Sequence, residues 1–249
     1  MLQKKRLGVI SGMGTRAGLF FLNKLTESID APRDQDFPEF IVHNNSQIPD
    51  RTLAIVYGEK SPKNELLRSI NLMRQQEVDY IVSTCVTSYH FINKLEDRLR
   101  KNILDPVDLV HNTIKKDFRD IRRIGLLATT GTINSNLFHK KFHNSPFELV
   151  TLDKHEQEEK FMRSVYMEGG LKSAQILDKA YSLFQDSVNG LKKKNVDLIV
   201  GGCTEVQIGY SKIKETIPYI DAVDVLVDEV IRKMNLKNKK LNRNIVCNG

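Results

Sequence analysis

The feature that most constrains the fold is an internal repeat built from two separate motifs. Residues 79–85 and 197–203 are both short apolar runs that begin with aspartate and end with cysteine. A second motif, at residues 7–15, aligns without gaps on residues 124–132. It precedes the cysteine motif by 72 residues in the first copy (7 to 79) and by 73 in the second (124 to 197). Such equal spacing is hard to obtain by chance, so the repeat predicts a duplicated, two-domain protein.

Within each copy, short apolar runs bounded by Gly, Asp or Pro alternate with amphipathic stretches. Runs of the first kind suit buried parallel strands, and the amphipathic stretches are typical of helices. The alternation predicts βαβ units, and so an α/β fold of two pseudo-symmetric domains, each a parallel sheet flanked by helices. The expected strands are residues 7–10, 40–43, 80–84, 124–127, 149–152 and 198–200, and the expected helices are residues 17–29, 64–76, 88–99, 156–166 and 173–194.

The boundary between the domains is expected after Pro106. Residues 107–215 then form the second domain. A last helix, at about residues 223–234, is expected to return the chain to the first domain, which would comprise residues 1–106 and 216–249.

The two repeated cysteines, Cys85 and Cys203, follow equivalent strands. In parallel α/β sheets, ligands bind beyond the carboxyl ends of the strands. The turns at residues 12–15 and 129–132 fall at the same ends. We therefore expect an active site in the cleft between the two domains.

Two thiols placed symmetrically around one cavity can remove a proton from one face of a carbon and return it to the other. This arrangement is typical of a cofactor-independent racemase. A thiol acts as a base only when it is a thiolate, and a strand-to-helix turn favours that anion. Thr87 and Thr204 are candidate caps for the two helices. Cysteine is also a common buried small residue, but the symmetric pair favours catalysis. Cys247, in the tail, is expected to be inert.

Composition narrows the class of protein. The net charge is +7, and much of the excess lies in residues 192–194 and 237–243, without the interleaved aromatics of a nucleic-acid stacking surface. We expect no nucleic-acid partner, although a small anionic substrate fits the charge. No apolar stretch approaches the ~20 residues needed to span a bilayer, so no membrane partner is expected.

The N-terminal segment, the cysteines and the histidines indicate the compartment and the absence of a cofactor. Residues 7–10 are too short for the apolar region of a signal peptide, so we expect a cytoplasmic protein whose thiols stay reduced. Three cysteines in such a chain do not indicate a disulfide framework. The six histidines show no metal-ligand spacing, and no metal or other cofactor is expected.

Two other features are candidate parts of a binding site. The Gly12-Met13-Gly14 turn and the threonine turn at 129–132 could bring N–H groups and hydroxyls to an anion, or could simply be tight turns. The glycines fall short of a dinucleotide-binding pattern. Arg51, in a predicted loop, is suited to bidentate carboxylate binding, although a solvated surface charge is the alternative. His90 is close to Cys85 in sequence, but a helix-surface position is favoured.

Taken together, these motifs resemble the aspartate/glutamate racemase family of PLP-independent enzymes, and its aspartate racemase branch most closely. The resemblance covers nearly the whole chain. The stretches that carry it are 8–14, 34–36, 44–52, 85–87, 126–132, 170–172 and 202–205.

The resemblance implies a racemase that interconverts L- and D-aspartate, with glutamate as an alternative substrate, and that forms a homodimer. Cys85 and Cys203 match the cysteines that flank the substrate α-carbon. Arg51 would hold the side-chain carboxylate, and Lys172 matches a lysine of the aspartate branch. The full set of implied substrate-binding residues is Gly12, Met13, Arg51, Val86, Thr87, Thr129, Thr132, Lys172, Thr204 and Glu205.

The chain departs from the family pattern beside the first cysteine. Val86 stands where the family usually has a substrate-contacting asparagine, and Tyr89 replaces the following histidine. Thr15 replaces a proline and Phe37 a histidine. Two alternatives therefore stay open: an enzyme of the hydantoin racemase or maleate isomerase type, and a catalytically weak dicarboxylate-binding protein.

Overall fold

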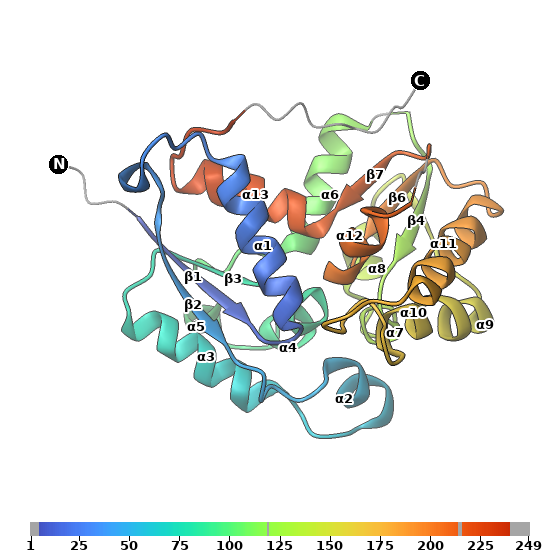
Figure 1. Ribbon diagram of the computed structural model, residues 1–249, viewed down its shortest axis with the longest axis horizontal. Helices are drawn as coiled ribbons and strands as arrows, with labels where there is room; N and C mark the ends of the chain where they lie inside the picture. Colours follow the sequence, from blue (N-terminus) through green and yellow to red (C-terminus); the bar gives the residue numbers. More distant parts are fainter. Residues whose placement is uncertain (1–4, 119, 214–215, 240–249) are drawn as a thin grey trace. The chain divides into compact units, whose positions relative to one another are not determined.

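The computed structural model describes residues 5–118, 120–213 and 216–239, coloured along the chain in Figure 1. The chain forms two compact units. The first contains the described residues up to Pro106 and those from Val223 onward, and the second contains Val107–Ala222. The chain re-enters the first unit at Val223 and not at 216, because residues 219–221 pair with the sheet of the second unit. Cys247 lies outside the described residues.

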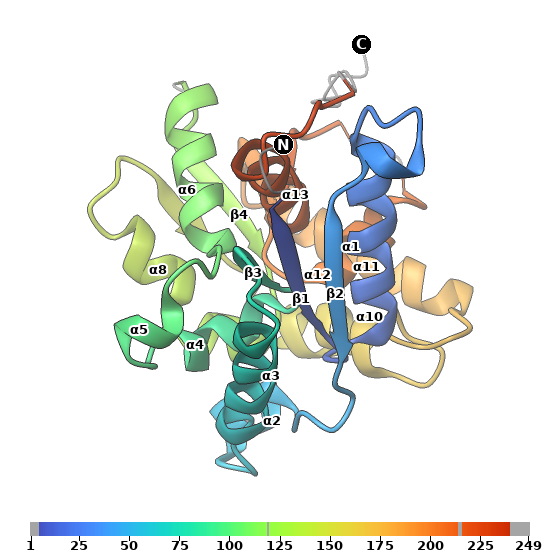
Figure 2. The same ribbon diagram turned by 90° about the vertical axis from the view of Figure 1, so that its left-hand side faces the viewer.

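The first unit is built on a three-stranded parallel sheet in the order β2-β1-β3, which Figure 2 shows with β1 in the middle. Its elements are β1 (Arg6–Ser11), α1 (Thr15–Ser28), the 3-10 turn η1 (Asp34–Asp36), β2 (Glu39–Asn44), α2 (Arg51–Tyr57), α3 (Lys63–Gln75), β3 (Tyr80–Ser83), the 3-10 turn η2 (Val86–Ser88), α4 (Tyr89–Ile92), α5 (Asp97–Arg100) and the returning α13 (Ala222–Lys233).

Helices α1 and α3 cover opposite faces of this sheet. A Cβ added at Gly8 would lie 2.8 Å from Sδ of Met73 in α3, whereas the Ser11 side chain lies against Gly18 of α1. Positions 8 and 11 point to opposite faces of β1, because side chains alternate along a strand. The sheet is therefore a middle layer, and Leu7, Val9 and Ile10 within it are fully buried.

Helix α13 belongs to the first unit through contacts at both of its ends. Lys24 of α1 forms an ion pair with Asp224, and Nζ of Lys5 donates to the carbonyl of Lys233 at 2.6 Å. Both contacts join α13 to residues of the first unit.

The second unit is built on a four-stranded parallel sheet in the order β5-β4-β6-β7. Its elements are α6 (Pro106–Asp117), β4 (Arg123–Leu127), α7 (Thr130–Asn134), α8 (Leu137–Phe142), β5 (Glu148–Val150), α9 (Lys154–Glu156), the π-helical turn η3 (Gln157–Met162), α10 (Arg163–Tyr166), α11 (Asp178–Lys192), β6 (Leu198–Gly201), α12 (Thr204–Tyr210) and β7 (Tyr219–Asp221).

The two sheets share one pairing register, and this confirms the predicted pair of parallel α/β units. β1 pairs with β3 starting at Leu7 opposite Tyr80, and β4 pairs with β6 starting at Ile124 opposite Leu198. The order β2-β1-β3 in the first sheet corresponds to β5-β4-β6 in the second. Strand β7 is an addition to the second sheet that the sequence pattern did not predict.

Three local expectations were wrong. The strand at 40–43 is not buried: β2 is an edge strand, and Val42 is 40% exposed. The helix expected at 88–99 is broken into η2, α4 and α5, because the backbone is extended at Glu96 and a new helix begins after it. The helix expected at 173–194 begins only at Asp178.

Candidate active site

The first cysteine lies just beyond the carboxyl end of β3. Cys85 has extended backbone angles, occupies the N-cap of η2, and is only 9% exposed. Its carbonyl accepts hydrogen bonds from Ser88, at 3.1 Å from N and 2.6 Å from Oγ. The Ser88 hydroxyl is also 2.8 Å from that of Ser83. The backbone of Cys85 is thus held by a buried pair of serines.

Tyr89, which replaces the histidine of the family pattern, is a structural residue. It is fully buried, its hydroxyl donates to the carbonyl of Leu104 at 2.7 Å, and it accepts from N of Ser83 at 3.2 Å. Burial raises the pKa of the Tyr89 phenol, so it stays protonated as a donor. Tyr89 therefore anchors the end of β3 two residues before the cysteine. His90 lies in α4, where Nε2 is 2.7 Å from Nζ of Lys94.

The turn after β1 requires glycine at its first position. Gly12 has a positive φ of 95°, and a Cβ there would lie 2.3 Å from the carbonyl carbon of Asn45. Asn45 is buried and is itself held: its Nδ2 donates to Oε2 of Glu65 at 2.9 Å and to Oγ of Ser69 at 3.2 Å. The backbone of Gly12 and Met13 is therefore packed tightly against the loop that follows β2.

Arg51 is not a solvated loop residue. It begins α2, whose N-cap Asp50 accepts from N of Thr52 at 2.7 Å and of Leu53 at 3.0 Å, and it is only 6% exposed. Its guanidinium donates from Nη2 to the carbonyl of Met13 at 2.6 Å, and from Nη1 to that of Pro49 at 3.0 Å. Arg51 thus ties the Gly12-Met13-Gly14 turn to the loop before α2. Its role toward a carboxylate stays a prediction.

The expectation that Thr87 and Thr204 cap the helices was wrong. The cysteines themselves occupy the two N-cap positions, and neither makes a side-chain cap hydrogen bond. Thr87 and Val86 lie buried within η2, and Thr204 is the buried first residue of α12. Each thiol is therefore attached at the point where the first N–H groups of a helical turn are unsatisfied within the turn.

The second cysteine has an acidic partner. Cys203 follows β6 and is 5% exposed, and its Sγ donates to Oε2 of Glu205 at 2.7 Å. The pKa of the Cys203 thiol is raised well above its ordinary value, first by burial and then by the charge and hydrogen bond of the Glu205 carboxylate. Cys203 is therefore a protonated thiol at neutral pH, next to a group that can accept its proton.

Lys172 acts on the same thiol in the opposite direction. Its positive charge lowers the pKa of Cys203, although burial and Glu205 outweigh it. The half-buried side chain places Nζ 4.0 Å from the centroid of the Tyr166 ring. Within the second unit, the structure thus brings together three of the residues predicted for the site: Cys203, Glu205 and Lys172.

The threonine turn after β4 is the counterpart of the glycine turn after β1. Thr129 is the N-cap of α7, and its Oγ1 accepts from N of Thr132 at 3.3 Å. The two hydroxyls are 3.1 Å apart and both residues are buried. N of Gly202 donates to the carbonyl of Leu127 at 2.8 Å, which joins the ends of β4 and β6. The turn and Cys203 therefore follow neighbouring strands of one sheet.

Several buried residues at the carboxyl ends of the two sheets were not predicted from the sequence. In the first unit they are Ser83, Ser88 and Asn45, and in the second they include Gln157 and the fully buried Asp221 at the end of β7. A Cβ added at Gly201 would lie 2.5 Å from Oδ2 of Asp221. An aspartate inside an apolar stretch, as in Tyr219-Ile220-Asp221-Ala222-Val223, is a signal that could have identified this residue.

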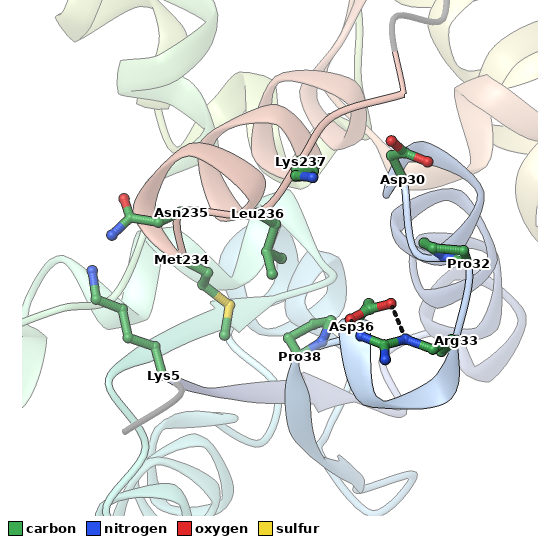
Figure 3. A pocket seen from close by; sticks show the side chains of 10 residues that line it. All are labelled: Lys5, Asp30, Pro32, Arg33, Asp36, Pro38, Met234, Asn235, Leu236 and Lys237. Carbon is green, nitrogen blue, oxygen red and sulfur yellow. Dashed lines mark hydrogen bonds and ion pairs between the residues drawn. The ribbon is translucent and has the colours of Figure 1, made fainter. Parts of the chain in front are cut away.

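A cavity of about 520 Å³ lies in the first unit, and Figure 3 labels the residues that line it. Lys5 and Pro38, which line it, directly precede β1 and β2, so the cavity lies at the amino ends of the strands. Its Arg33 is already paired with Asp36, with Nη2 and Oδ1 2.8 Å apart.

Among the described residues no group of three or more His, Cys, Asp or Glu side chains could hold a metal ion. No helix within residues 5–118, 120–213 and 216–239 is long and apolar enough to cross a membrane.

Comparisons with known proteins point to one family. The family model described as Asp/Glu/Hydantoin racemase matches residues 10–230. An aspartate racemase from Picrophilus torridus has a similar structure, with a TM-score of 0.81 and 26% identity over 98% of this chain and 99% of that one. The broad specificity amino-acid racemase RacX of Bacillus subtilis is 20% identical over 229 residues, 90% of this chain and 96% of the relative. A glutamate racemase from a Thermoanaerobacter species is 29% identical over 170 residues, 66% of this chain and 60% of the relative.

Proposed function

The chain belongs to the Asp/Glu/hydantoin racemase family and is an amino-acid racemase, and we propose that it interconverts L- and D-aspartate, with Cys85 and Cys203 exchanging protons with opposite faces of the substrate α-carbon. One observation carries the mechanism: two buried free cysteines occupy equivalent N-cap positions beyond equivalent strands of a duplicated fold. The proposal requires that the two thiols reach one α-carbon from opposite faces.

In one direction, Cys85 acts as the base and Cys203 as the acid. The Cys85 thiolate takes the α-proton, and the protonated Cys203 donates its proton to the opposite face of the carbanion. The raised pKa of Cys203 supports its assignment as the group that begins as an acid.

In the other direction, Cys203 must first lose its proton. Glu205 is the acceptor, because its Oε2 already receives the Cys203 hydrogen bond. Cys85, a thiolate in the first direction, takes a proton from solvent and becomes a thiol. The Cys203 thiolate then takes the α-proton of the other enantiomer, and the Cys85 thiol protonates the opposite face. The α-proton of an amino acid is only weakly acidic, so N–H and hydroxyl donors must stabilise the carbanion without pyridoxal phosphate or a metal.

Three features support an acidic amino acid, and aspartate first, as the substrate. The relative with the TM-score of 0.81 is named an aspartate racemase. Lys172 supplies a positive charge beside Cys203, and the Thr129 and Thr132 hydroxyls lie within one turn. We assign Thr129 and Thr132 to the α-carboxylate, and Lys172 and Arg51 to the side-chain carboxylate. The remaining contacts that we propose are Gly12, Met13, Val86, Thr87, Thr204 and Glu205.

A second candidate, a catalytically weak dicarboxylate-binding protein, is favoured by one observation. Val86 is 4% exposed and apolar, directly after Cys85, where the family pattern has a polar asparagine. A protein of this kind binds aspartate but racemises it only slowly.

The test measures racemisation of L- and D-aspartate and of L- and D-glutamate by circular dichroism, with isothermal titration for binding. The proposal expects racemisation of aspartate and its loss, by about a thousandfold or more, in Cys85→Ser and Cys203→Ser. Cys247→Ser is the matched control and should keep wild-type activity. Binding of aspartate without any racemisation would favour the second candidate, and activity on glutamate alone would overturn the substrate assignment.

Two finer expectations accompany the proposal. The mechanism needs reduced thiols, so we propose a reducing compartment such as the cytoplasm. A homodimer is proposed from the family resemblance, and light scattering after gel filtration would test it.

A further inference from the structure

A helical segment that the proposed mechanism does not use forms hydrogen bonds with the threonine turn of the second unit. This segment is the π-helical turn η3 (Gln157–Met162), which continues α9 and leads directly into α10. Three of its side chains bond to residues 128 and 130, on either side of the N-cap residue Thr129. π-Helical turns are rare and occur often at functional sites.

The contacts are polar and short. Nε2 of Gln157 donates to the carbonyl of Ala128 at 2.9 Å. The hydroxyl of Thr130 donates to Oε1 of Glu158 at 2.6 Å, and N of Thr130 donates to Sδ of Met162 at 3.3 Å. Residues 128 and 130 are therefore both fixed by the same turn of helix.

The π geometry explains how Gln157 and Met162 reach the turn together. These residues are five apart, at the two ends of η3. In a π-helix the hydrogen bonds join residues five apart, so such residues stand nearly one above the other. In an α-helix residues three and four apart share a face, and residues five apart diverge. The wider turn thus lets both side chains face the segment that contains Thr129.

Gln157 is costly to bury, which argues for a directional role. It is 6% exposed, and its buried Oε1 has no hydrogen-bond partner among the described residues. A leucine would fill a similar volume without this penalty. The amide is explained by its N–H bond to the Ala128 carbonyl, at the point where β4 gives way to the turn.

We propose that Gln157 is a positioning residue for substrate binding. By fixing the Ala128 carbonyl, and together with the contacts of Glu158 and Met162 to Thr130, it preorganises Thr129 and Thr132 to receive a carboxylate. This inference rests on the proposed function, which assigns these threonines to the substrate. A group that organises binding and not proton transfer should affect KM and leave kcat nearly unchanged.

The kinetic test compares Gln157→Leu with the matched control Gln185→Leu. Gln185 is half-buried in helix α11 of the same unit and bonds only weakly to Asn189, at 3.4 Å. Loss of one buried neutral hydrogen bond predicts a KM for aspartate raised about five- to tenfold in Gln157→Leu. The kcat of Gln157→Leu should stay within about twofold of wild type, and Gln185→Leu should change neither constant. An unchanged KM, or a fall in kcat alone, would overturn the proposal.

A second pair of variants covers the case in which Gln157→Leu fails to fold. Thr130→Val removes the hydroxyl that bonds to Glu158, and Thr130→Ser keeps it. The proposal expects a raised KM in the valine variant and near-wild-type KM in the serine variant. Equal effects of the two variants would contradict it.

Hydrogen exchange separates failure of this inference from failure of the proposed function. If the wild-type protein racemises none of the four acidic amino acids, the proposed function fails, but the turn can still be examined. Mass spectrometry should show faster amide exchange at residues 129–133 in Gln157→Leu than in Gln185→Leu. Equal exchange in the two variants would overturn the positioning role whether or not the enzyme is active.

Discussion

The segments that carry Cys85 and Cys203 have equivalent backbone positions in the repeat but different chemical surroundings. Cys85 and Cys203 follow strands paired in the same register, and each stands at an N-cap. Around Cys203 the chain supplies a carboxylate acceptor in Glu205 and a nearby cation in Lys172. Around Cys85 it supplies serine hydroxyls on the backbone and an apolar neighbour, Val86. A duplicated fold can therefore place two equivalent atoms while their surroundings give them different acid–base properties.

The turns that precede the two cysteines differ in the same way. Gly12 and Thr129 are equivalent positions of the repeat. The first turn uses glycine so that backbone can pass close to Asn45, whereas the second uses a hydroxyl as its N-cap. The first turn is thus specialised for close backbone packing and the second for side-chain hydroxyls.

After the loss of either cysteine itself, the largest effect is expected from removing the acidic partner that only Cys203 has. Glu205→Gln keeps the shape of the side chain but removes the proton acceptor and the charge. We expect kcat to fall by about a hundredfold in the direction that begins with Cys203 as base. The initial rates from L- and from D-aspartate, measured separately by circular dichroism, would locate the loss. Because the equilibrium constant between the enantiomers is one, kcat/KM must be equal in the two directions. The ratio of the KM values for L- and D-aspartate must therefore change by the same factor as the ratio of the kcat values. Wild-type rates in both directions would remove Glu205 from the mechanism.

The next effect tests whether the first turn depends on backbone packing. Gly12→Ala combines a positive φ with a Cβ 2.3 Å from Asn45, and we expect a loss of about 3 kcal/mol in the free energy of unfolding. Gly58→Ala is the matched control, because Gly58 also has a positive φ, of 69°, but no atom lies within 4 Å of its added Cβ. Its loss should be about 1 kcal/mol. Urea denaturation of both variants measures the difference, and equal losses would refute the packing argument.

The smallest effect concerns stability at high pH. The folded state holds the Cys203 proton more tightly than the unfolded state, in which the pKa is near its ordinary value of 9.0. The contribution of this proton to the free energy of unfolding is fully present below pH 9.0 and is lost as pH rises toward the pKa of the folded state. The free energy of unfolding should fall by about 1.4 kcal/mol per pH unit from this group.

Cys203→Ala isolates that contribution from other groups that titrate in the same range. Urea denaturation at a series of pH values above 9.0 should show a shallower fall for Cys203→Ala than for the wild type. Parallel curves for the two proteins would show that the thiol proton is not held as described.

Much of the fold could be predicted from the sequence, because the repeat and the alternation of elements are patterns that nearby residues carry. Strand β7 could not be predicted, because Tyr219–Asp221 is only three residues long. It is a strand because it pairs with β6, which is distant in the sequence. The candidate site was predicted in its residue types but not in its contacts. The burial of Arg51 against backbone carbonyls and the reach of Gln157 to Ala128 depend on residues distant in the sequence. So does the anchoring of Tyr89 on Leu104.

The central claim is that two different thiols handle the proton, and isotope exchange in deuterated water tests it most directly. L-aspartate is incubated with the enzyme, and the deuterium content of both enantiomers is measured at low conversion. With two bases, the D-aspartate formed should carry deuterium at Cα, because Cys203 has exchanged its proton with solvent. The recovered L-aspartate should remain almost entirely protiated. Protium retained in the product, or deuterium entering the recovered substrate as fast as the product, would show a single base and contradict the account.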